Sequence, residues 1–345
     1  MAFDPNGTGN KKAGIFSLPM TEEESRLVFI GVPWEVTTSY GDGCSFGPAA
    51  VLESSKQLDL CDALYGEFYE KGLFMRPISQ EWKDRSDKLK TKALLIKETL
   101  ESGDELSSAQ LADQELINQA SVELNDWLYQ QSLEVLDAGK IPAVIGGDHS
   151  SPFGLIKALK SKHENLSLLH IDAHHDLRKS YQGYQYSHAS IMFNVMEELS
   201  PHSLVQMGIR DFCPEEQRMA CDDQRIHTYY DSQVSVRLGE GETWASIARE
   251  AISHLSDEVY VSFDIDGLSP DLCPNTGTPV PGGINFQQME SLLFELQKSN
   301  KKVLGFDLCE VSPEGQQGTN TPILDGWDGN VGARVLFKLA GLSLS

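Results

Sequence analysis

Four segments of the chain each follow a short apolar run and carry side chains that bind metal ions or transfer protons. They are Gly146-Gly147-Asp148-His149-Ser150, Asp172-Ala173-His174-His175-Asp176, Asp264-Ile265-Asp266 and Asp307-Leu308-Cys309-Glu310. On an extended backbone, alternate residues share a face, which groups Asp172, His174 and Asp176, and pairs Asp264 with Asp266. Such carboxylates converging in one crevice would repel each other at a cost of roughly several kcal/mol. We therefore expect a bound cation.

The size of this donor set indicates more than one ion. Four carboxylates and two imidazoles exceed the needs of one tetrahedral zinc, but they suit two divalent ions of about five or six ligands each. The oxygen-rich set favours manganese, and the imidazoles leave nickel, cobalt and iron open. A lone Asp-x-Asp is more often a turn or helix cap, so the argument depends on the four segments together. His175 should point away from His174, and we expect it to have a structural role.

The elements that would position these residues alternate along the chain. Buried parallel strands are predicted at Leu27–Gly31, Ile141–Ile145, Leu166–Ile171, Leu204–Ile209, Val259–Phe263 and Val303–Asp307, and helices at 117–135, 244–255 and, after the N-cap Asn285, 286–296. This alternation predicts an α/β protein, a single three-layer αβα domain with a mainly parallel sheet. In such sheets, functional residues gather beyond the carboxyl ends of the strands.

Domain organisation follows from composition along the chain. Residues 1–26 begin with a polar, Gly-rich stretch and are expected to be a loose N-terminal segment, followed by one domain over 27–345. The polar stretch near 80–114 is predicted to be an insertion that forms a surface helix and loop.

The charge balance argues against two classes of partner. The 345 residues include 28 Lys+Arg and 51 Asp+Glu, a formal net charge of −23. Phosphate backbones and anionic lipid would repel such a chain, so we expect neither nucleic-acid nor membrane binding. Because its start lacks the basic and apolar regions of a signal peptide, we expect a cytoplasmic protein.

The metal-binding motifs resemble those of the ureohydrolase family, which comprises arginase, agmatinase and formimidoylglutamase. The resemblance is strongest to the agmatinase branch and extends from Gly31-Val32-Pro33 and Gly43-Cys44-Ser45-Phe46-Gly47-Pro48 to Glu310-Val311-Ser312-Pro313. It implies an arginase-like fold and hydrolysis of a guanidino compound to urea and an amine. It also implies a homo-oligomer, a trimer or hexamer.

The resemblance assigns the ligands of two manganese ions. One would be held by His149, Asp172, Asp176 and Asp264, the other by His174, Asp172, Asp264 and Asp266, with Asp172 and Asp264 bridging. A metal-bridging hydroxide would then attack the guanidinium carbon.

Three further residues receive catalytic or substrate-binding roles from the same resemblance. Asp176 would pass a proton to the departing amine. His188 matches a mobile histidine that shuttles protons or positions substrate, although a helix-start histidine is an equal alternative. Glu310 matches the carboxylate that holds the guanidinium NH2 groups, with a structural ion pair as the alternative.

Because of Arg178, the sequence does not decide which substrate the protein binds. Formimidoylglutamases carry an arginine at this position, whereas the His149 motif has the arginase and agmatinase form. At the pocket mouth, Arg178 would clamp a substrate carboxylate, or it would pair with a surface acid. Release of formamide from formimidoylglutamate and hydrolysis of guanidine or a guanidino acid are therefore alternatives. An arginase-fold deacetylase and a non-catalytic, metal-stabilised protein are more remote ones.

Overall fold

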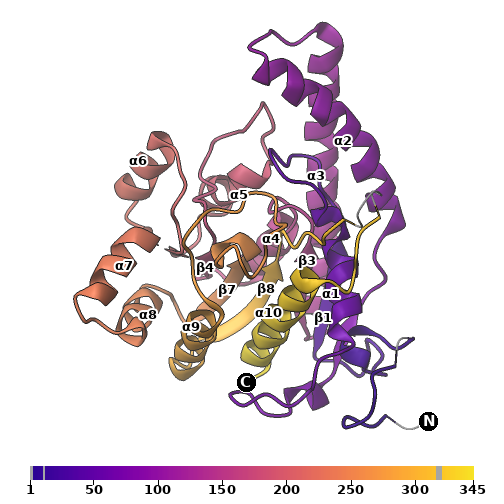
Figure 1. Cartoon of the computed structure of the whole chain (residues 1–345), viewed down its shortest axis with the longest axis vertical. Helices are drawn as coiled ribbons and strands as arrows, with labels where there is room; N and C mark the ends of the chain where they lie inside the picture. Colours follow the sequence, from indigo (N-terminus) through magenta and orange to yellow (C-terminus); the bar gives the residue numbers. More distant parts are fainter. Residues whose placement is uncertain (1–2, 11, 316–320) are drawn as a thin grey trace.

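The centre of the molecule is a parallel β-sheet (Figure 1). The computed structural model describes residues 3–10, 12–315 and 321–345, and within these the sheet has eight strands in the order β2-β1-β3-β8-β7-β4-β5-β6. The strands are β1 (Leu27–Val32), β2 (Leu73–Met75), β3 (Ile141–Gly146), β4 (Ser167–Ile171), β5 (Leu204–Met207), β6 (Ile226–Tyr229), β7 (Glu258–Phe263) and β8 (Lys302–Leu308). Every neighbouring pair is parallel.

All six strands predicted from the sequence are present, and two more lie at the sheet edges. The additional strands are β2 and β6, of three and four residues. Runs this short carry too little periodicity to be recognised before their neighbours are known.

Helices cover both faces of the sheet, which confirms the three-layer αβα architecture. They are α1 (Gly47–Ser55), α2 (Gln80–Glu101), α3 (Ser108–Asp137), α4 (Phe153–Lys162), α5 (Ile191–Asn194), α6 (Pro214–Asp222), α7 (Asp231–Gly239), α8 (Trp244–Ser253), α9 (Phe286–Lys298) and α10 (Trp327–Leu344). Along β1, Leu27 and Phe29 pack into the core beneath α1, α8, α9 and α10, whereas Val28 and Ile30 pack beneath α2, α3, α4 and α5. This alternation is the two-residue period of a strand buried on both faces.

The polar stretch near 80–114 is a pair of helices rather than one surface helix and a loop. Helix α2 begins after Ser79, whose side chain accepts a hydrogen bond from the backbone N–H of Trp82, and α3 begins at a capping box formed by Ser107 and Gln110. Residues 102–107 join the two helices, and the tip of this α2–α3 hairpin projects from the top of the molecule in Figure 1. Helix α3 thus begins inside the expected insertion and continues into the core.

The N-terminal segment is not loose over its whole length. Ile15, Phe16 and Leu18 are buried and belong to the same core cluster as α1 and α10. This corrects the expectation for these residues, because their apolar side chains gain more from burial than from solvent exposure. Residues 1–2 and 11 of the expected segment lie outside the described residues, and the boundary at residue 26 stays a prediction.

We looked in the described residues for a helix long and apolar enough to cross a membrane and found none.

Candidate active site

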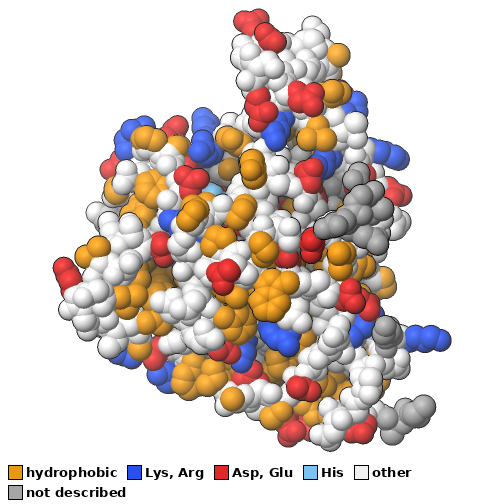
Figure 2. Space-filling view, viewed as in Figure 1, with side chains coloured by type: hydrophobic (Ala, Val, Ile, Leu, Met, Phe, Trp, Pro, Cys, Tyr) orange, Lys and Arg blue, Asp and Glu red, His pale blue; other side chains and the backbone are white. Residues whose placement is uncertain are grey.

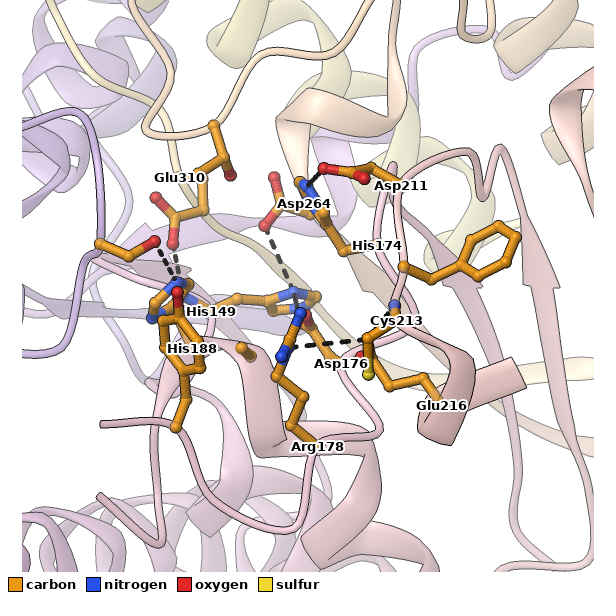
Figure 3. Close-up of a pocket in the computed structure, with 15 residues that line it drawn as sticks. His149, His174, Asp176, Arg178, His188, Asp211, Cys213, Glu216, Asp264 and Glu310 are labelled. Atoms are coloured by element: carbon orange, nitrogen blue, oxygen red, sulfur yellow. Dashed lines mark hydrogen bonds and ion pairs between the residues drawn. The ribbon is translucent and has the colours of Figure 1, made fainter. Parts of the chain in front are cut away.

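The four chemistry-bearing segments meet because their strands are consecutive in the sheet. The order β3-β8-β7-β4 places the carboxyl ends of four strands side by side, although β8 is the last of them in the chain. His149 follows β3, Glu310 follows β8, Asp264 follows β7 and Asp176 follows β4, and Figure 3 shows all four around one pocket. The pocket has a volume of about 200 Å³.

His149 lies at the centre of a group of three carboxylates. Its Nδ1 is 2.9 Å from Asp172 Oδ2, 3.0 Å from Asp176 Oδ2 and 3.3 Å from Asp264 Oδ2. All four side chains are buried. A single proton on Nδ1 could satisfy only one of these oxygens, and the remaining carboxylates would still face one another.

The hydrogen bond made by Nε2 defines the tautomer of the neutral His149 ring. Its Nε2 is 3.0 Å from Ser262 Oγ, and Ser262 donates its own hydroxyl proton to Asp307 Oδ2 at 2.8 Å. The Ser262 oxygen is therefore left to accept from His149 Nε2–H, which turns the Nδ1 lone pair toward the carboxylates. Nδ1 is buried without a hydrogen-bond partner among the described residues. Lone pairs converging from one imidazole and three carboxylates are what a divalent cation requires.

A second group surrounds His174. Its Nδ1 is 3.4 Å from Asp172 Oδ1 and 3.2 Å from Asp266 Oδ2. Asp172 therefore faces both histidines, one with each oxygen, as a bridging ligand would. Asp264 lies beside His149, and its other oxygen accepts a hydrogen bond from the Asp266 backbone N–H at 2.9 Å, so its bridging role stays a prediction.

The electrostatics of this cluster also favour a bound cation. Burial, followed by the neighbouring Asp172 charge, raises the pKa of Asp176 to about 6. Burial and the charges of Asp266 and Asp172 raise the pKa of Asp264 well above its usual range. Positive ions among these oxygens would lower both values and keep the carboxylates ionised at neutral pH. The residues present fit a buried metal site with two adjoining positions.

Glu310 presents an unsatisfied carboxylate oxygen to the same pocket. Its Oε1 accepts a hydrogen bond from the His149 backbone N–H at 3.0 Å, whereas Oε2 is buried without a partner among the described residues. Gly277 leaves the space beside this oxygen open, because a Cβ there would lie 3.0 Å from Oε2. Burial and the charge of Asp148 raise the pKa of Glu310 to about 8. An incoming planar cation would remove this electrostatic cost.

Comparison with known proteins identifies the family. The model of the arginase family matches residues 25–326. The agmatinase of Bacillus anthracis is 30% identical over 324 residues, covering 94% of this chain and 95% of that protein. An N(1)-aminopropylagmatine ureohydrolase of Thermus thermophilus is 31% identical over 301 residues, 85% of each chain. The solved structure of proclavaminate amidino hydrolase from Streptomyces clavuligerus has the same fold, with a TM-score of 0.72 at 20% identity over 98% of this chain and 99% of that one.

The chain belongs to the arginase family. It is a ureohydrolase, a hydrolase that acts on amidino carbon–nitrogen bonds. The family and the arginase-like fold inferred from the sequence motifs are thereby confirmed.

His188 lines the pocket of this ureohydrolase at the start of a short 3-10 turn, His188–Ser190. Its Nδ1 is 3.4 Å from Thr37 Oγ1, its Nε2 is 3.3 Å from Ser39 Oγ, and its backbone N–H donates to Thr37 Oγ1 at 3.0 Å. Burial, followed by the charges of His174 and His149, lowers its pKa to about 3. Burial thus favours the neutral imidazole of His188, which is held against the loop that contains Thr37.

Arg178 lines the pocket and also has an acidic neighbour. Its Nε is 3.6 Å from Glu216 Oε2 (Figure 3). Its guanidinium carbon is 5.0 Å from the centre of the Tyr181 ring. Glu216 is buried and accepts hydrogen bonds from the backbone N–H groups of Leu177 and Cys213 at 3.2 and 2.9 Å. Arg178 is thus both a pocket-lining cation and one member of an ion pair.

Several pocket residues were not predicted from the sequence. They include Ser39, Tyr181, Asp211, Glu216 and Thr278. Asp211 follows β5, so the rule that placed the other carboxylates at strand ends would have indicated it. The remaining four lie on loops or at the start of a helix, where no periodic pattern marks them.

The two histidines that flank the cluster support it from outside the pocket. The side chain of His175 points away from the cluster, with Nδ1 2.7 Å from Gln206 Oε1 and Nε2 3.2 Å from Tyr230 Oη. His170 Nε2 lies 2.8 Å from Asp172 Oδ2, and the Gln206 amide donates to His170 Nδ1 at 2.9 Å. His170 therefore orients Asp172.

Proposed function

We propose that this ureohydrolase hydrolyses a guanidino compound to urea and an amine at a binuclear metal centre. The observation that carries the proposal is the buried, unpartnered Oε2 of Glu310 beside the His149 and His174 groups. A guanidinium bound to Glu310 would place its carbon next to the carboxylate cluster. The names of the relatives, agmatinase and N(1)-aminopropylagmatine ureohydrolase, support a guanidino substrate.

The proposed metal ligands are His149, Asp172, His174, Asp176, Asp264 and Asp266. When bound, two divalent ions supply a water activated for nucleophilic attack and stabilise the negative charge that develops in the transition state. The oxygen-rich donor set favours manganese, with nickel, cobalt or iron as alternatives.

The protein residues supply binding and proton transfer. Glu310 would hold two guanidinium NH groups and orient the trigonal carbon. Asp176, beside the proposed ions, would pass a proton to the nitrogen of the departing amine. His188 would position the substrate from the opposite wall, or accept a proton through its neutral ring.

Arg178 favours a second candidate class, in which the substrate has an acidic tail. Its guanidinium would clamp a carboxylate at the pocket mouth, so a guanidino acid or formimidoylglutamate would bind better than agmatine. Glu216 opposes this, because it already offsets part of the arginine charge.

A substrate panel tests the proposal. Agmatine, arginine, guanidino acids, guanidine and formimidoylglutamate would be incubated with metal-loaded protein, with urea and formamide measured separately. Urea release supports the proposal, and formamide release alone would replace it with the formimidoylglutamase alternative. Release of neither product from any of them would contradict it.

Two further expectations accompany this proposal. By the resemblance, the protein would form a trimer or hexamer, which light scattering tests. The other is a cytoplasmic location, which cell fractionation tests.

A further inference from the structure

The α2–α3 hairpin contacts both loops that form the outer part of the pocket. Figure 1 shows the tip of this hairpin rising away from the sheet, and Figure 2 shows charged side chains over that tip. The lower part of the hairpin packs into the core through side chains that include Trp82, Leu89, Ile117 and Leu124. Its inner face is therefore fixed to the body of the protein.

Helix α2 holds the first loop, residues 33–43, through Lys90. The Lys90 ammonium forms an ion pair with Glu35 and another with Asp42 at 2.6 Å, and it lies 3.4 Å from Thr38 Oγ1. Glu35 is buried, and its carboxylate also accepts from the backbone N–H groups of Gly43 at 3.0 Å and Ser45 at 2.7 Å. One carboxylate thus joins both ends of the loop to the helix.

A second contact from α2 fixes the same loop by its backbone. The Glu35 N–H donates to Ser86 Oγ at 2.9 Å, one turn before Lys90 on the helix. This loop carries Thr37 and Ser39, and both contact the His188 ring. A continuous chain of polar contacts therefore runs from Lys90 through Glu35 and the loop to His188.

Helix α3 holds the second loop, residues 181–185. The Gln114 side chain donates to the Gln182 carbonyl at 2.8 Å, and the Asn118 side chain donates to the Gly183 carbonyl at 3.1 Å. Asn118 Oδ1 also accepts from the Gln185 N–H at 3.0 Å. This loop begins with Tyr181, whose ring lies under Arg178.

We propose that the α2–α3 hairpin is a positioning element of the active site, in which Lys90 holds the loop that carries Thr37 and Ser39 against His188, and Asn118 holds the loop that carries Tyr181 under Arg178. Neither residue touches the carboxylate cluster. The hairpin would therefore set substrate binding at the outer pocket and leave the metal centre unchanged.

A substitution on α2 tests the proposed role of Lys90, and a second substitution on the same helix is the matched control. Lys90→Met removes the ammonium, whereas Lys92→Met removes an ion pair internal to the hairpin, Lys92 to Asp113 at 2.6 Å. Lys90→Met should raise KM by about 10- to 100-fold with a smaller change in kcat, because misplaced pocket walls lose substrate contacts. Lys92→Met should stay near wild type, both variants should retain their metal, and Lys90→Arg should restore part of the loss.

A substitution on α3 tests the proposed role of Asn118 in the same way. Asn118→Leu removes the two hydrogen bonds that Asn118 makes to the 181–185 loop and leaves the one from Gln114. The adjacent Gln119→Leu removes a side-chain contact with Glu123 on the surface of α3. Asn118→Leu should raise KM more than Gln119→Leu does. Equal kinetics in each matched pair, or loss of metal from Lys90→Met, would overturn the proposal.

The kinetic readout rests on the proposed function, so a measurement independent of turnover accompanies it. Hydrogen exchange in residues 33–43 should be faster in Lys90→Met than in Lys92→Met, and exchange in 181–185 should be faster in Asn118→Leu than in Gln119→Leu. Unchanged exchange would overturn the positioning role. If the wild-type protein cleaves none of the substrates while exchange responds as expected, the proposed function fails and the positioning role stands.

Discussion

The inner and outer parts of the pocket satisfy their polar groups in different ways. At the inner end, three carboxylates surround His149 Nδ1, and Glu310 Oε2 has no partner among the described residues. At the outer end, Arg178 pairs with Glu216, and the His188 ring lies against two hydroxyl groups. The inner end needs cations from outside the chain, whereas the outer end is already balanced by its own residues.

This difference suggests that the inner end carries out the reaction and the outer end selects the substrate. Two residues of the inner end, Asp176 and Glu310, have positive φ angles of 55° and 61°, a backbone conformation that costs free energy in a non-glycine residue. Strand ends hold them in place. The outer end is built from loops whose positions depend on contacts with the α2–α3 hairpin, so changes there should alter the substrate rather than abolish the reaction.

Loss of one inner carboxylate should have the largest effect. Asp264→Asn keeps the shape of the side chain and removes a proposed metal ligand, so we expect urea release to fall by about 1000-fold or more. Elemental analysis should find fewer than the roughly two ions per chain expected of the wild type. His175→Asn, on the opposite side of the same sheet edge, should keep most activity. Equal, complete losses in both variants would mean that we have misidentified the side that faces the ions.

Neutralising Glu310 should have the second largest effect on activity. Glu310→Gln removes the charge that a guanidinium would need, and kcat/KM should fall by an amount equivalent to about 2 to 4 kcal/mol. Steady-state kinetics with the best substrate of the panel would measure it. Glu314→Gln, four residues away and exposed, is the matched control. Kinetics unchanged from wild type would remove Glu310 from the site.

Removal of the ions should destabilise the fold by a smaller amount. The inner carboxylates repel each other without a cation, and ions present at 100 times their dissociation constant add about 2.7 kcal/mol to the free energy of unfolding. Thermal unfolding with and without a chelator should therefore show a lower Tm for the stripped protein, and manganese should restore it. The same Tm under both conditions would contradict a metal site at the inner end.

Substitution of Arg178 should have the smallest effect, and a selective one. If Arg178 clamps a carboxylate, Arg178→Met should lower kcat/KM for an acidic substrate by about tenfold and leave a cationic substrate nearly unchanged. Lys179→Met, at the exposed neighbouring position, controls for a general change of charge. Parallel small changes on both substrates would leave Arg178 as the partner of Glu216 alone.

The sequence by itself grouped five of the inner residues by their spacing. Asp172, His174 and Asp176 alternate after one apolar run, and Asp264 and Asp266 after another, so the period of an extended chain assigns each group to one face. The carboxyl ends of parallel strands share one edge of the sheet, so the sequence places both groups on that edge. These are local regularities, and a sequence displays them directly. The two groups meet because β4 and β7 are neighbours in the sheet.

The tertiary structure alone decided the strand order, the outer end and the role of the polar stretch. Strand β8 lies between β3 and β7, and this brings Glu310 to within hydrogen-bonding distance of His149 from 161 positions away in the chain. The pairing of Arg178 with Glu216, and of Lys90 with Glu35, likewise joins residues that no local pattern relates. Such contacts depend on how helices and loops pack after the sheet has formed. Periodicity describes a residue's neighbours along the chain, and it carries no information about which distant segment packing will bring beside it.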